Sequence, residues 1–274
     1  MFLIDFKKIN KFNPIIAWWS GGIASAITCW ICIEWFGKEN VMVVFIDTKN
    51  EDEDTYRFKD DCEKWYGVKI HTTTSKKWDC IQEVWEHYLS LNVATGAICS
   101  SELKRQVRQD FQLRHEYSYQ AFGFDVKEIG RAQNMAKNYP DSRPIFPLIY
   151  KLIGKIEALK ILQRYGIEPP RTYKMGYSNN NCFKTGCVKG GIGYWQKIGV
   201  DDPKKYDAMA DVEHYLTDLK GEPVTICKDQ SKGGGLVFLK PHPKYPQMKD
   251  LSMMKGRQPE MLMECNGFCG ITPS

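Results

Sequence analysis

Two hydroxyl side chains and two adjacent glycines near the start of the chain have the spacing of an anion-binding loop. They lie in residues 20–25, between the apolar run Ile15–Trp19 and a second apolar stretch that continues to Phe36. This order predicts a buried strand, a tight loop and a helix, so that backbone amides and the positive end of the helix surround the loop. We therefore expect this phosphate loop (residues 20–25) to bind a phosphate group, with a plain tight turn as the alternative. Its expected ligands are Ser20, Gly21, Gly22 and Ser25.

Four of the ten cysteines form two close pairs. Cys182 and Cys187 are separated by four residues, and Cys265 and Cys269 by three, with 77 residues between the pairs. Two such pairs are typical of a four-thiolate metal site, because each pair supplies two ligands from one turn of chain. The sequence thus predicts a zinc ion or an iron–sulfur cluster and leaves the choice between them open. Unligated or redox-active thiols are the alternative.

Apolar runs alternate with helical patterns through the first part of the chain. After the strand that precedes the phosphate loop, further strands are expected at Val41–Ile46, 68–72 and 119–124. Helices are expected around 81–89, 103–111 and 156–162. Strands that alternate with helices at this spacing predict an α/β fold, with a doubly wound, mainly parallel sheet and helices on both of its faces.

The pattern changes at Pro169 and Pro170, which cannot continue the helix before them. We therefore expect a first domain at residues 1–170 and a loop-rich, cysteine-containing C-terminal region at residues 171–274. Within that region the sequence predicts one clear helix near residues 209–219. Because so little of the region is periodic, a metal bound to its cysteines is the expected source of order.

The composition is that of an ordinary folded protein. Of 274 residues, 43% are hydrophobic and 26% are charged, which argues against disorder and against a disulfide miniprotein. The apolar runs are far shorter than the roughly 20 residues that cross a bilayer, and the first residues lack a secretory signal. We expect a cytoplasmic protein without membrane contact, whose thiols stay reduced. The formal charge of +5 suits phosphate-bearing ligands without establishing a nucleic-acid partner.

Four segments in order resemble a known family, the PAPS (phosphoadenosine phosphosulfate) reductase-like branch of the phosphate-loop (PP-loop) ATP pyrophosphatase superfamily. The resemblance spans about residues 15–170. Its segments are 18–25; 45–48 with 54–58 downstream; Cys99 with Leu103 and Lys104; and 123–128 with Arg131 and 146–148.

The resemblance implies that the first domain binds an adenine nucleotide (ATP, PAPS or APS, adenylyl sulfate) at the carboxyl ends of its strands, where open α/β sheets place their ligands. It implies nucleotide-binding roles for Asp47, Thr48 and Glu128 beside the phosphate loop, and catalytic roles for Lys104 and Arg131. For Asp47, capping of the next helix is the alternative. Many superfamily members have Lys-Asp where this chain has Ile23-Ala24. That departure weakens an assignment of Mg²⁺-dependent ATP hydrolysis but does not remove nucleotide binding.

Cys99 is the remaining cysteine with a chemical interpretation. It precedes the basic helix that carries Lys104, Arg105 and Arg108, where a helix N-terminus would lower its pKa and make the thiolate available. A solvated basic face is the alternative for this helix. Cys29 and Cys32 fall inside the apolar helix after the phosphate loop, so we expect them in the core.

Three functions remain open. The first is an enzyme that acts at the α-phosphate or sulfate of an adenine nucleotide, in sulfur transfer or in modification of a nucleic acid or metabolite. The second is a thiol-dependent PAPS or APS reductase, for which Glu264 and Cys265 imperfectly resemble the family's Glu-Cys-Gly segment. The third is a non-catalytic nucleotide-binding module.

The cysteine pattern resembles the clusters of adenylyl-sulfate reductases and of related DNA-phosphorothioation enzymes. A nucleic acid, a sulfur-donor protein and a homo-oligomer stay open as partners.

Overall fold

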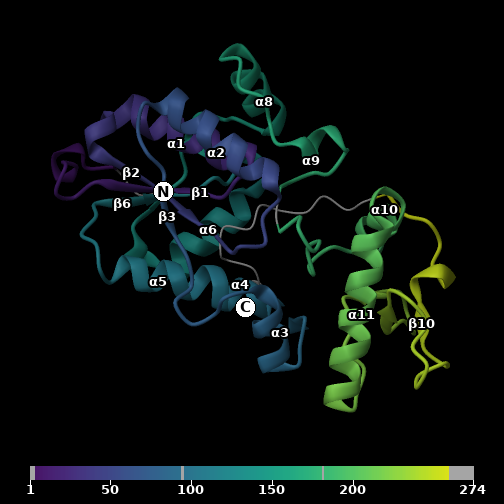
Figure 1. Ribbon diagram of the computed structural model, residues 1–274. Coiled ribbons are helices and arrows are strands. Elements are labelled where there is room, and N and C mark those ends of the chain that lie inside the picture. Colours follow the sequence, from purple (N-terminus) through teal and green to yellow (C-terminus); the bar gives the residue numbers. More distant parts are fainter. Residues whose placement is uncertain (1–3, 94–95, 181, 259–274) are drawn as a thin grey trace.

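The largest sheet has five parallel strands in the order β3-β2-β1-β6-β7 (Figure 1). The computed structural model describes residues 4–93, 96–180 and 182–258. The strands are β1 Ile15–Trp19, β2 Val41–Ile46, β3 His71–Thr73, β6 Tyr119–Ala121 and β7 Pro144–Ile145. The expected α/β fold class is confirmed. Because β1 lies between β2 and β6, the order of strands reverses beside β1, and such a switch point is where α/β sheets bind ligands.

Helices cover both faces of this sheet (Figure 1). All five residues of β1 are buried, as expected for a parallel strand enclosed on both sides. Ile15, Ala17 and Trp19 pack into one core cluster, while Ile16 and Trp18 pack into the other. The first cluster includes residues of α1 Ile23–Phe36, α2 Glu53–Tyr66 and α8 Lys155–Arg164, and the second includes residues of α5 Gln106–Gln112 and α6 Ile129–Asn138.

Helix α1 is apolar on almost every side and is correspondingly buried. Cys29 and Cys32 lie within it with no exposed surface, which confirms that they belong to the core. Cys62 of α2 is also fully buried, and burial raises the pKa of its thiol to about 12. These three thiols are therefore protonated packing groups.

Two strands are shorter than expected. The expected strand at 68–72 starts at His71, because Gly67 ends α2 in a left-handed turn and the Ile70 amide donates to Glu63 instead of to a neighbouring strand. The expected strand at 119–124 pairs with β1 only up to Ala121. The remaining short elements are β4 Asn92–Val93, β5 Gly96–Ala97, α3 Ile81–Tyr88, α4 Ile98–Ser100, a π-helical turn at Ser101–Arg105, α7 Pro147–Tyr150 and α9 Arg171–Lys174.

The C-terminal part has its own helices and a small sheet (Figure 1). The helix expected near 209–219 is α11 Pro203–Lys220, and α10 Ile192–Asp201 precedes it. The sheet contains β8 Cys227–Lys228, β9 Leu236–Phe238 and β10 Lys249–Asp250. A third core cluster joins Trp195 and Leu216 of this part to Trp85 and Leu103 of the first part. The division at residue 170 stays a prediction, but packing connects residues from both sides of it.

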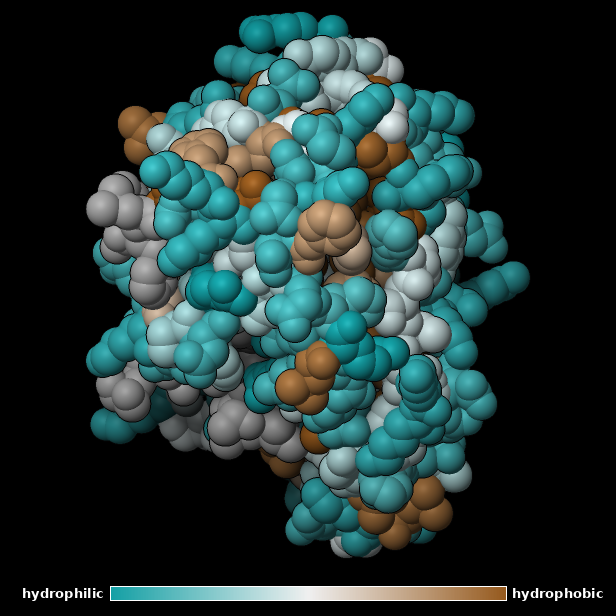
Figure 2. Space-filling model, turned by 90° about the vertical axis from the view of Figure 1, so that its left-hand side faces the viewer, coloured by the Kyte–Doolittle hydropathy of each residue, from teal (hydrophilic) through white to brown (hydrophobic). Residues whose placement is uncertain are grey.

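The face shown in Figure 2 is mainly hydrophilic, with hydrophobic residues in small separate groups. Among the described residues, every helix is too short or too polar to cross a bilayer.

Candidate functional site

The phosphate loop connects the carboxyl end of β1 to the start of α1. The Ser25 hydroxyl closes it, donating to the Gly22 carbonyl at 2.9 Å and accepting the Ser20 amide at 3.0 Å. Gly22 is the N-cap residue of α1 and has no side chain to bond the first amides of the helix. The positive end of a 14-residue helix thus receives no side-chain cap from its own N-cap residue at the switch point of the sheet.

Two glycines let other segments approach this loop. Gly21 has a φ of 83°, and a Cβ atom on it would lie 2.8 Å from Cγ2 of Thr55. A Cβ atom on Gly123 would lie 2.9 Å from both the amide nitrogen and the Cα of Ser25. The segments after β6 and in α2 therefore pack directly on the loop backbone.

The loop after β2 carries Asp47 and Thr48. The Asp47 carboxylate accepts the Lys49 amide at 2.7 Å and the Tyr56 hydroxyl at 3.0 Å. Burial, followed by the negative charge of Asp47, raises the pKa of Tyr56, so this hydroxyl stays a donor. Asp47 does not cap α2, because the N-cap residue of that helix is Asp52.

A buried ion pair lies beside Thr48. The Thr48 hydroxyl donates to Oε1 of Glu51 at 2.9 Å, and Nζ of Lys104 lies 3.7 Å from the same oxygen. Lys104 and Arg108 are 6% and 3% exposed, so the interpretation of this helix as a solvated basic face is wrong for both. Lys104 comes from the π-helical turn, and Glu51 holds it to the loop after β2.

Arg131 is held in place by two neighbours. Its guanidinium pairs with the carboxylate of Glu128 and lies 4.9 Å from the ring centroid of Phe124. Asp125 forms a capping box with Glu128 that starts the short helix before α6. Because this segment follows Gly123, which packs on the phosphate loop, Arg131 and Glu128 belong to the same edge of the sheet as the loop.

The segment from α9 to Asn180 also contacts the phosphate loop. The Ile23 amide at the start of α1 donates to the Tyr173 hydroxyl at 3.2 Å. Asn180, which is 1% exposed, donates to the Gly21 carbonyl at 3.1 Å and to the Thr55 hydroxyl at 2.7 Å. Residues more than 140 positions from the phosphate loop therefore help to shape it.

Cys182 and Cys187 lie in a loop folded around two aromatic side chains of α10 (cysteine loop, residues 182–190). The Cys187 amide donates to the Tyr194 hydroxyl at 3.1 Å, and a Cβ atom on Gly186 would lie 2.6 Å from the ring of Trp195. Burial raises the pKa of Tyr194, and the nearby thiols of Cys187 and Cys182 raise it further. Both cysteines are half-buried next to one tyrosine, as a pair of ligands from one turn requires.

The other expected metal ligands, Cys265 and Cys269, lie outside the described residues. Within residues 4–93, 96–180 and 182–258, no group of three or more His, Cys, Asp or Glu side chains is arranged to hold a metal ion. The half-buried thiol pair fits half of a four-thiolate site, and the complete site stays a prediction.

Cys99 lies in α4, where it is 8% exposed and packs in the third core cluster. The prediction that it precedes the basic residues on one helical stretch is confirmed, because α4 runs into the π-helical turn and α5. Its catalytic role stays a prediction.

Residues 6–106 match the family model of the phosphoadenosine phosphosulfate reductase domain. The match covers less than half of the chain, and over these residues the chain is similar to that domain. An uncharacterized protein of Methanocaldococcus jannaschii is 25% identical over 222 residues, an alignment that covers 76% of this chain. The chain spans only 42% of the length of that relative.

Two solved structures are more distantly similar to this chain. The PAPS reductase of Candida auris, in a phosphate complex, is 14% identical with a TM-score of 0.45, and the match covers 61% of this chain and 79% of that one. The U34-tRNA thiolase NcsA of Methanococcus maripaludis, with its 4Fe–4S cluster, is 13% identical with a TM-score of 0.41. That match covers 93% of this chain and 85% of the thiolase.

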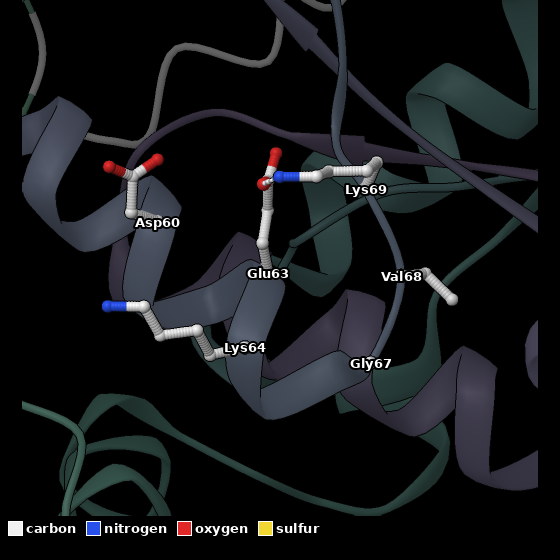
Figure 3. Close-up of a pocket in the computed structure, with 6 residues that line it drawn as sticks. All are labelled: Asp60, Glu63, Lys64, Gly67, Val68 and Lys69. Atoms are coloured by element: carbon white, nitrogen blue, oxygen red, sulfur yellow. Dashed lines mark hydrogen bonds and ion pairs between the residues drawn. The ribbon is translucent and has the colours of Figure 1, made fainter.

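A hollow of about 500 Å³ lies elsewhere on the first part of the chain, between the end of α2 and the start of β3 (Figure 3). Its central carboxylate, Glu63, accepts from Lys59 at 2.6 Å, from Lys69 at 2.7 Å and from the Ile70 amide at 3.0 Å. These three donors hold the pKa of Glu63 down, at about 2, against the opposing effect of burial. The carboxylate is thus used in joining α2 to β3, at the edge of the sheet opposite the phosphate loop.

Sequence reasoning missed three residues of the site. Glu51, Tyr173 and Asn180 stand in segments that have no strong local pattern of their own. The run of asparagines at 179–181 indicated only a loop, whereas in the structure the buried Asn180 amide is satisfied by three hydrogen bonds to distant residues.

Proposed function

We propose that this chain is an enzyme that binds an adenine nucleotide, ATP or a sulfonucleotide, with its phosphates on the phosphate loop. The observation that carries the proposal is the start of α1, where the N-cap residue Gly22 makes no side-chain cap and which lies at the switch point of a parallel sheet behind two consecutive glycines. Free amides at a helix N-terminus bind phosphate oxygens, and glycine lets those oxygens come close to the backbone. The family match over residues 6–106 supports the same assignment.

The charged side chains around the loop suit reaction at the α-phosphate or sulfate. Arg131 is already oriented by Glu128 and Phe124, and Lys104 by Glu51, so little ordering is needed when the nucleotide binds. With ATP, an oxygen of the acceptor bonds to the α-phosphorus, the bond to pyrophosphate breaks, and the acceptor proton passes to water. The loop amides and Arg131 stabilise the charge that develops on the phosphorus oxygens.

In the same proposal, Cys182 and Cys187 act with Cys265 and Cys269 as ligands of a zinc ion or an iron–sulfur cluster. Zinc would stabilise this part of the chain, whereas a cluster would supply electrons or sulfide. The acceptor is a nucleic acid or a metabolite, and a sulfur-donor protein is a candidate partner.

Calorimetric titration of the purified protein with ATP, APS and PAPS tests this proposal, with assays for pyrophosphate and sulfite release. We expect binding of at least one of these nucleotides, weakened about tenfold or more in Lys104→Met, which removes one charge next to the phosphates. The matched control is Lys64→Met, because Lys64 is exposed on α2 and should leave affinity unchanged. Sulfite release from PAPS would select the reductase. Absence of binding at millimolar nucleotide, or equal affinities in the two variants, would contradict the proposal.

A further inference from the structure

The side chain of Asn180 makes hydrogen bonds with all of its polar groups. Its Nδ2 donates to the Gly21 carbonyl at 3.1 Å and to the Thr55 hydroxyl at 2.7 Å, and its Oδ1 accepts the Thr172 hydroxyl at 2.9 Å. Thr172 and Thr55 have no exposed surface, so all three contacts are shielded from water. The Thr172 hydroxyl fixes which end of the amide faces the phosphate loop.

The contact with Gly21 decides how one peptide unit of the phosphate loop is oriented. In a trans peptide, the Gly21 carbonyl and the Gly22 amide point in opposite directions. Because glycine stands on both sides of this unit, its rotation meets little steric resistance. By holding the carbonyl, Asn180 directs the Gly22 amide to the opposite side, where it is available to an anion.

A second connection joins the cysteine loop to the segment after β2. Nδ2 of Asn50 donates to the Thr185 hydroxyl at 2.8 Å, and the Asn50 carbonyl accepts the Lys184 amide at 3.2 Å. Asn50 itself donates its amide to the Thr48 hydroxyl at 3.3 Å. Cys182 therefore stands between two attachment points, and each leads directly to a loop of the nucleotide site.

Building on the proposed function, we propose that Asn180 is a positioning residue that couples nucleotide binding to the reactivity of Cys182 and Cys187. A phosphate on the loop stabilises the orientation of the Gly21–Gly22 peptide that Asn180 also requires. The bound nucleotide thereby holds the chain on either side of Cys182 in place. Because nucleotide binding and ordering of the cysteine loop are coupled equilibria, ordering of that loop in turn raises nucleotide affinity.

The experiment is alkylation of the protein as isolated with iodoacetamide, with and without saturating ATP, and in a parallel series PAPS. Rates are followed by mass spectrometry on the peptides that contain Cys182 and Cys187, with Cys80 at the start of α3 as internal reference. We expect nucleotide to slow both reactions at least about fivefold, within the usual range of coupling between sites. The rate at Cys80 should not change.

Asn180→Ala should bind nucleotide more weakly and, at saturation, lose the protection of both thiols. Thr172→Val removes only the hydrogen bond to Oδ1 of Asn180 and should lose part of this protection. For each variant, the alkylation rate with nucleotide is compared with the rate of the same variant without nucleotide. A general loss of stability therefore does not produce a false loss of protection. The coupling would be overturned, and the proposed function kept, by either of two results. One is nucleotide that binds wild type but leaves the alkylation rates unchanged, and the other is equal protection in wild type and Asn180→Ala. Failure of wild type to bind either nucleotide would overturn the proposed function with it.

Discussion

The ammonium group of Lys104 lies 3.7 Å from the carboxylate of Glu51, and the two side chains are 7% and 0% exposed. Such a pair is costly to desolvate, and its members compensate each other only while both are present. The pair lies next to Thr48, at the carboxyl edge of the sheet, which is the edge of the candidate site.

Removing one member of this pair should therefore lower the free energy of unfolding more than removing both members does. We expect Glu51→Gln to lower the free energy of unfolding by about 3 kcal/mol, because it leaves a buried ammonium without its counterion. Glu51→Gln combined with Lys104→Met should cost less than the sum of the single changes. Urea unfolding of the four proteins measures this coupling, and strictly additive costs would show that the pair does not interact.

The close approach of Thr55 to Gly21 predicts a local effect of Gly21→Ala. A left-handed alanine costs about 1 kcal/mol wherever it stands, and here the new methyl group also meets Thr55. Gly67→Ala is a matched control, because Gly67 has a φ of 65° and open space around its Cα. We expect a similar backbone penalty in both variants, with loss of nucleotide affinity only in Gly21→Ala. Calorimetric titration and thermal unfolding separate the two effects, and equal affinities would refute this account of the loop.

Glu213 should make stability depend on pH. It is fully buried in α11, where it accepts the Ile226 and Leu239 amides at 2.6 Å each, yet burial raises its pKa to about 8. Because the folded state holds the proton more tightly than the unfolded state, the stabilisation that Glu213 contributes is fully present below its unfolded pKa near 4.5. It falls as pH rises toward 8, by a few kcal/mol at roughly 1.4 kcal/mol per pKa unit.

Urea unfolding between pH 5 and 8 tests this dependence. The free energy of unfolding of Glu213→Gln should change less with pH over that range than that of wild type, because the glutamine side chain does not titrate. Exposed Glu222→Gln is the control and should keep the wild-type slope. If the free energy of unfolding of Glu213→Gln depended on pH as steeply as that of wild type, the pH dependence would come from another group.

The cysteine prediction is tested by metal analysis of protein purified without oxygen. If the four thiols bind metal, Cys182→Ser with Cys187→Ser should lose it, whether that is about one zinc per chain or iron with sulfide. Cys80→Ser is the control and should retain the wild-type content. Wild-type protein free of both metals would refute the metal site and return Cys265 to consideration as a nucleophile.

The sequence correctly predicted those parts of the fold whose signals are local. The apolar run of β1, the following glycines and the apolar α1 give a strand, a loop and a helix wherever they stand in a chain. Helix α10 was missed because Gly190 and Gly191 indicated a loop. In the structure Gly190 lies against the ring of Tyr194 and Gly193 against the backbone of Gln258, so these glycines provide room for packing.

By itself the sequence determined the α/β class, the strand–loop–helix order around residues 20–25 and the likeness to a family domain, because periodicity, turn residues and ordered motifs act over short distances along the chain. Only the tertiary structure decided which distant groups complete the site. Asn180 and Gly21 are 159 positions apart, and no local pattern links a loop asparagine to a glycine carbonyl. Such contacts form only once the sheet and its helices have brought the segments together, since a buried polar group must then find its partner there.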